Sequence, residues 1–192
     1  MCMIDFLGTL LIIAAKYYYK VVHFFNKKLA VNIDYEKYYK DNNVAKIINS
    51  LHSKKANIIN EFDLSSYVYI KMWNSRVINL LDGDVKVNKI FQKEISMLER
   101  LPNIERALYM FVDPNSDITE HLDDDDKTTY RILIGVCGEG EFSNVSKQQT
   151  NVLTKGKSIG VDVEVELHKG KNYTNNLWSV LIVCISKESY RV

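Results

Sequence analysis

Two histidines and one aspartate are the residues of this sequence whose types and spacing suggest chemistry. His121 and Asp123 form an H-x-D pair at a predicted strand, and His168 comes at the end of another predicted strand. Residues two apart on an extended segment point to the same side. Two imidazoles and one carboxylate on one face of a metal ion, with open positions opposite, make the site of non-haem iron(II) oxygenases. We therefore predict that His121, Asp123 and His168 are metal ligands.

Each of these residues also has a simpler interpretation. His121 alone fits an exposed loop histidine beside acids, and His168 alone fits an ordinary strand-end residue. Asp123 opens a run of four aspartates that ends at Asp126, and such a run is usually a solvated loop because the charges repel one another. The run lacks the spacing of an EF-hand calcium loop. We expect Asp123 to turn inward and the other three to stay in water.

Arg131 is the fourth candidate residue, in an otherwise apolar predicted strand. A buried guanidinium needs a paired anion. Its fork of donors grips carboxylates in a bidentate manner, as a site for 2-oxoglutarate requires. The alternative is an internal salt bridge to Glu164 or Glu166.

The bulk composition argues against a nucleic-acid partner and against a disulfide-bonded fold. The 192 residues carry a net charge of +1, and no zinc-finger spacing or basic patch is present, so we expect no nucleic-acid partner. Three scattered cysteines do not make a disulfide framework and favour a reducing compartment. Abundant Lys, Asn, Ile and Tyr fit an AT-rich genome, such as that of a large DNA virus.

The first 28 residues predict a hydrophobic and amphipathic membrane-associated segment. Residues 6–15 are uncharged and mostly apolar, too short to span a bilayer alone, which takes about 20 residues. Lys16, Lys20 and Lys27 then share one helical face. Positive charge after the apolar run predicts that the rest of the chain is cytosolic. If the gene is viral, this is the cytosol of an infected cell. The alternative is a helix packed on the domain.

Residues 29–192 predict one domain of the α+β class, with a helical part over 29–104 and a β core over 105–192. Helical patterns cover residues 34–60, with breaks expected at 42–43 and 52–53. A further helix is expected from residue 85 to 101, ended by Pro102. Short strands come after it, of the kind found in a sandwich or jelly roll. They are expected at 106–112, 118–122, 128–137, 151–154, 160–167 and 178–186.

Several of these segments together resemble the aspartyl/asparaginyl β-hydroxylase family. The resemblance covers roughly residues 66–186 and is best over 101–136, through Leu-Pro-Asn-Ile-Glu-Arg-Ala, Asp-Pro-Asn-Ser, His-Leu-Asp and Tyr-Arg-Ile-Leu-Ile-Gly-Val. Downstream it includes Gly156, His168 and the closing apolar strand. It implies N-terminal helices followed by a double-stranded β-helix (jelly roll) that binds Fe(II) and 2-oxoglutarate. It also implies hydroxylation of Asp or Asn side chains of a protein, or, less expected, of a lipid acyl chain.

By position, the resemblance makes His121, Asp123 and His168 the iron ligands and Arg131 a cosubstrate-binding residue. One position departs from the family's pattern: Trp178 stands where the family has an arginine for the distal carboxylate of 2-oxoglutarate. Unless Lys157, Lys169 or Lys171 substitutes, cosubstrate binding should be weak.

Three hypotheses are compatible with these residues. The first is an Fe(II)/2-oxoglutarate-dependent hydroxylase acting on a protein substrate. The second is an oxygenase fold with a decayed cosubstrate site, serving as a membrane-tethered binding or structural module. The third is a sugar- or metal-binding jelly roll of another lineage, which predicts that the imidazoles of His121 and His168 lie much more than about 5 Å apart, since metal–nitrogen bonds are near 2 Å.

Overall fold

The computed structural model describes residues 33–61, 69–70, 74–123 and 129–188. The chain divides into a unit of residues 1–30 and a unit of residues 31–192, and the second unit contains all of the described residues. The predicted membrane segment, residues 1–28, lies outside the described residues. Among the described helices, none is long and apolar enough to cross a membrane.

Three helices and ten strands are described. In chain order they are α2 (Tyr35–Asp41), α3 (Val44–Glu61), β1 (Tyr69–Ile70), β2 (Ser75–Asn79), α4 (Val85–Leu98), β3 (Ile104–Val112), β4 (Ser116–His121), β5 (Thr129–Cys137), β6 (Gly140–Asn144), β7 (Gln149–Leu153), β8 (Ser158–Asp162), β9 (His168–Asn172) and β10 (Trp178–Ser186).

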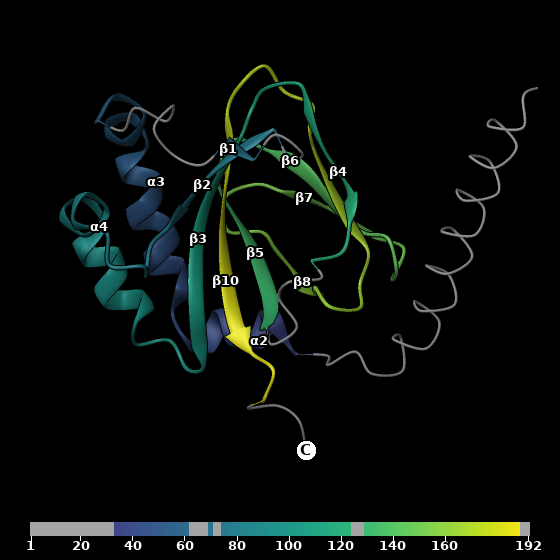
Figure 1. Cartoon of the computed structure of the whole chain (residues 1–192), viewed down its shortest axis with the longest axis horizontal. Coiled ribbons are helices and arrows are strands. Elements are labelled where there is room, and N and C mark those ends of the chain that lie inside the picture. Colours follow the sequence, from purple (N-terminus) through teal and green to yellow (C-terminus); the bar gives the residue numbers. More distant parts are fainter. Residues whose placement is uncertain (1–32, 62–68, 71–73, 124–128, 189–192) are drawn as a thin grey trace, which may run out of the picture. The chain divides into compact units, whose positions relative to one another are not determined.

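The strands form two antiparallel sheets, as the jelly-roll prediction requires. A six-stranded sheet has the order β1-β2-β3-β10-β5-β8, and a four-stranded sheet has the order β4-β9-β6-β7. Helices α3 and α4 lie on one side of the six-stranded sheet, and the four-stranded sheet lies on the other (Figure 1). The architecture is a jelly roll preceded by helices, which confirms the predicted α+β class.

Strand β10 shows why the core has two parts. Its even-numbered residues from Trp178 to Cys184 belong to the core between the sheets, and Leu181, Val183 and Ile185 belong to the core under the helices. Because both faces are covered, the strand reads as an unbroken apolar run. This run predicted its bounds correctly, 178–186.

The helices follow the predicted pattern with two corrections. The break at residues 42–43 is present, with Asn43 at a φ of 53°, but α3 continues through the break expected at 52–53. There the Ser53 hydroxyl donates to the Ser50 carbonyl, and a His52 ring nitrogen lies 2.9 Å from the Val136 carbonyl of β5. Tertiary anchoring thus outweighs the poor helix propensity of these residues. Helix α4 ends at Leu98 rather than at residue 101.

Strand prediction failed in several places. The strand expected over 160–167 ends early, because β8 ends at Asp162 and a turn follows it. His168 begins β9 rather than ending a strand, and neither β9 nor β6 was predicted. The turn between β8 and β9 keeps Val163 and Val165 buried, which explains the misleading alternation. In addition, β1 and β2 lie inside the part expected to be helical, 29–104.

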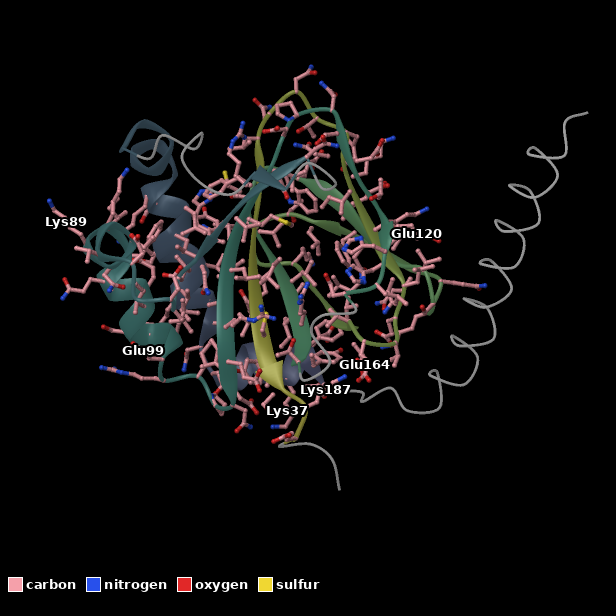
Figure 2. All side chains as sticks on the ribbon, in the orientation of Figure 1. Lys37, Lys89, Glu99, Glu120, Glu164 and Lys187 are labelled. Carbon is pink, nitrogen blue, oxygen red and sulfur yellow. The ribbon has the colours of Figure 1, made fainter. Side chains whose placement is uncertain are left out.

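A buried ion pair closes the jelly roll after β10. The Lys187 ammonium, 1% exposed, lies 3.0 Å from an Asp162 carboxylate oxygen and 2.6 Å from a Glu164 oxygen. Figure 2 shows the labelled Glu164 and Lys187 close together. Since Asp162 ends β8, this pair ties the segment after β10 to the turn that leads into β9.

Removing the lysine should therefore be costly. Lys187→Met leaves the buried Asp162 carboxylate without this cation, and we expect stability to fall by about 3–5 kcal/mol in urea denaturation. Lys171→Met is the matched control, because Lys171 pairs with Asp117 at 3.7 Å on the surface and exposed pairs contribute about 0–1 kcal/mol. Equal effects of the two substitutions would contradict this role of the buried pair.

Candidate metal centre

A β-bulge in β4 places His121 in the interior. Ile118 pairs with Gly170 of β9, and His121 pairs with His168, so β4 holds one more residue than β9 between these pairs. Ile118 is buried, while Thr119 and Glu120 are exposed. The extra residue lets both Ile118 and His121 face inward, which strict alternation would forbid.

Asp123 joins the two histidines from the loop that follows β4. Its backbone N–H donates to the Val163 carbonyl at 3.3 Å, and its carboxylate is only 5% exposed. One carboxylate oxygen lies 3.2 Å from His168 Nε2, and the other lies 3.9 Å from His121 Nε2. The ring centroids of His121 and His168 are 4.4 Å apart, so the wide separation expected for an unrelated jelly roll is not found.

Both imidazoles are oriented as metal ligands are. His121 Nδ1 lies 2.6 Å from the Thr119 carbonyl, and His168 Nδ1 lies 2.9 Å from the Glu166 carbonyl. A carbonyl only accepts, so each Nδ1 carries the proton and donates it. Each Nε2 is then the nitrogen directed at Asp123 and available to a metal, the arrangement in which an outer hydrogen bond fixes the tautomer of a ligating histidine.

The protonation states of His121 and Asp123 suit metal ligation. Burial lowers the pKa of His121 below its ordinary value, and the neighbouring His168 lowers it further. Burial alone would raise the pKa of Asp123, but the neighbouring His168 and the charge of Arg131 outweigh burial and lower it. At neutral pH His121 is therefore neutral and Asp123 ionised, and these are the forms that bind metals.

Arg131 lies beside the Asp123 carboxylate rather than beside Glu164 or Glu166, its alternative partners. One guanidinium nitrogen donates to Asp123 at 2.6 Å, whereas Glu164 pairs with Lys187 and Glu166 with Lys147. Arg131 therefore compensates the buried charge of Asp123. A guanidinium has five N–H donors, so this pair and a contact to a further carboxylate are compatible.

A small cavity adjoins the site between the two sheets. Its volume is about 30 Å³, which is room for about two waters. Besides His121, Arg131 and His168, its lining is apolar, made of Met110, Ile118, Leu133, Phe142, Val161, Val163 and Ile182. Such a cavity suits the water-sized ligands of a metal, but 2-oxoglutarate fits only if some of these side chains move.

Trp178, at the position of the family's second arginine, is a core residue. It is fully buried, and its indole N–H donates to the Leu153 carbonyl at 3.1 Å. A Cβ added to Gly140 would come within 2.4 Å of its ring, so glycine is needed at this contact. Lys157, Lys169 and Lys171 do not replace the arginine, because all three are exposed and the last two line a groove of about 360 Å³ with the exposed Asp117 and Glu120.

The structure thus brings together all four predicted site residues and adds some that the sequence did not reveal. Phe142 of β6 stacks on the His168 ring, with centroids 5.6 Å apart. Glu166, which the sequence suggested only as a possible partner of Arg131, is buried and pairs with Lys147 instead. The signal that could have drawn attention to Glu166 is its place two residues before a candidate ligand.

The donor set and the geometry define a class of site. Among the described residues, His121, Asp123 and His168 are the group of potential ligands whose donor atoms converge, all within 4.8 Å of one another. Two imidazole nitrogens and one carboxylate oxygen fit a divalent transition metal such as Fe(II). The molecule is therefore a jelly-roll protein with a candidate mononuclear metal centre.

Comparison with known proteins does not assign the chain to a family. No protein-family model matches the chain, and no curated protein matches it. Similar solved structures include several cupin proteins. A viral collagen prolyl hydroxylase from Paramecium bursaria Chlorella virus-1, in a 2OG complex, has 18% identity over 70% of this chain and 89% of its own, with a TM-score of 0.46.

Two further solved structures are similar to this chain to a comparable degree. The plu4264 protein from Photorhabdus luminescens has 17% identity over 67% of this chain and 87% of its own, with a TM-score of 0.45. A Cupin 2 conserved barrel domain protein from Salinispora arenicola has 16% identity over 65% and 84%, with a TM-score of 0.43. All three TM-scores lie below 0.5, so the function has to be argued from the site.

The packing of Trp178 yields a testable consequence. Trp178→Arg removes a buried ring and inserts a charge among apolar side chains, so we expect a loss of at least about 3 kcal/mol of stability in urea denaturation. Tyr173→Arg, at an aromatic residue that is 40% exposed, is the control and should leave the unfolding midpoint unchanged. A stable Trp178→Arg protein that gains 2-oxoglutarate binding would instead show that an arginine at this position can bind the cosubstrate.

Proposed function

We propose that this protein is an Fe(II)- and 2-oxoglutarate-dependent hydroxylase acting on Asp or Asn side chains of a protein. The observation that carries the proposal is the convergence of His121, Asp123 and His168 with both Nε2 atoms directed at the carboxylate. Three protein ligands leave open positions on an octahedral metal, which the 2-His-1-carboxylate class of oxygenases uses for cosubstrate and dioxygen. The bound metal would supply the oxidising chemistry.

The chain's own residues would bind the metal, orient its ligands and exclude water. His121, Asp123 and His168 would hold the metal, and Arg131 keeps Asp123 ionised and directed inward. The apolar side chains that line the cavity, among them Phe142 and Ile182, would exclude bulk water from the reacting centre. Arg131 is also the residue proposed to contact a carboxylate of the cosubstrate.

The choice of substrate rests on the resemblance over residues 66–186, which favours a protein Asp or Asn over a lipid acyl chain. We propose that residues 1–28 associate with a membrane while the catalytic domain faces the cytosol, because Lys16, Lys20 and Lys27 follow the apolar run.

A second candidate function has a specific observation in its favour. Trp178 fills the place of the carboxylate-binding arginine with a packed and hydrogen-bonded side chain, and the cavity of about 30 Å³ is small for a dicarboxylate. These features fit a jelly roll that keeps its metal ligands but acts as a binding or structural module.

The metal site is tested by titration under anaerobic conditions. We expect His121→Ala to weaken Fe(II) binding in calorimetry by more than about 100-fold, because loss of a ligand costs more than the 10–100-fold typical of an outer partner. His52→Ala is the matched control, since His52 lies on α3 and contacts the Val136 carbonyl. Equal Fe(II) affinity of wild-type protein and His121→Ala would refute the assignment.

The cosubstrate separates the two candidates. If the protein is a hydroxylase, the Fe(II)-loaded form binds 2-oxoglutarate and converts it to succinate in the presence of Asp- or Asn-containing peptides. Arg131→Lys keeps the charge but loses the fork, and should weaken 2-oxoglutarate binding about tenfold or more. Fe(II) binding without any 2-oxoglutarate binding or succinate formation would favour the binding module.

A further inference from the structure

Glu166 is a buried carboxylate next to the metal centre that has no part in ligation. It is 3% exposed and lies in the turn between β8 and β9, two residues before His168. A buried carboxylate is costly unless it is paired and hydrogen-bonded. Its partners therefore show what the turn is built to hold.

The carboxylate of Glu166 is held from three sides. One oxygen accepts a hydrogen bond from the Asn144 side chain at 2.7 Å and from the Asp162 backbone N–H at 2.9 Å. The other oxygen lies 2.7 Å from the Lys147 ammonium. Asn144 ends β6 and Asp162 ends β8, so the side chain of Glu166 joins the two sheets at the place where β9 begins.

The backbone carbonyl of the same residue orients the ligand. It accepts the Nδ1–H of His168 at 2.9 Å, which directs Nε2 of His168 to the Asp123 carboxylate, 3.2 Å away. Because the side chain of Glu166 is fixed, its carbonyl has little freedom to turn. The position of the His168 ring therefore depends on contacts that Glu166 makes far from the metal.

We propose that Glu166 is the positioning residue of His168, and that Lys147 and Asn144 act on metal affinity through it. The inference rests on the proposed metal centre and concerns its outer support. Mutation of a residue that supports a ligating histidine by hydrogen bonding typically changes metal affinity 10–100-fold.

The test is a Co(II) titration of the metal-free full chain, followed by calorimetry and by the visible spectrum of the bound ion. Glu166→Gln keeps the shape of the side chain and removes its charge; we expect Co(II) affinity to fall about 10–100-fold with a changed spectrum. Glu164→Gln is the matched control, because Glu164 lies in the same turn but pairs with Lys187. The control should bind Co(II) as the wild type does.

Lys147→Gln is the second variant, in case Glu166→Gln does not fold. Lys147 is partly exposed, so its loss is tolerable, and we expect a several-fold drop in Co(II) affinity with an unchanged circular-dichroism spectrum. Wild-type affinity and spectrum in the folded variants, or an equal loss in Glu164→Gln, would overturn the inference. Absence of Co(II) binding by the wild type would overturn the proposed function itself, so the wild-type titration tells the two failures apart.

Discussion

The interior of this jelly roll depends on one buried carboxylate. Asp123 carries a negative charge between the sheets, and a charge in that place persists only with partners. Arg131 supplies a compensating charge from β5, and Nε2 of His168, at the start of β9, lies 3.2 Å from one carboxylate oxygen. The loop after β4, the six-stranded sheet and the four-stranded sheet are thereby connected through a single side chain.

The same interaction explains why the site is both structural and chemical. The carboxylate lies beside the imidazoles of His121 and His168, whose ring centroids are 4.4 Å apart. A divalent cation would add to the positive charge that Arg131 already places beside Asp123. Because the contacts of the fold itself bring the donors together, much of the ordering cost of a metal site is met by folding.

Much of the fold and of the site could be predicted from the sequence, for identifiable reasons. The apolar run of β10 and the pattern of α3 are local signals, and the H-x-D pair needs only an extended segment to bring its side chains together. The β4 bulge, the turn at residues 163–167 and the burial of Glu166 depend on which strands pair, and pairing is non-local. Trp178 stands out in the sequence as a departure, but its hydrogen bond to Leu153 and its contact with Gly140 become visible only in three dimensions.

The bulge at residues 119–120 also decides which length changes this strand tolerates. Because β4 holds one residue more than β9 in this stretch, deletion of either Thr119 or Glu120 would leave a regular strand in which Ile118 and the histidine are two positions apart and still share a face. Deletion of both residues would make them neighbours on opposite faces, and the histidine would turn toward solvent. The inward direction of this ligand therefore survives the loss of one residue from β4 but not the loss of two.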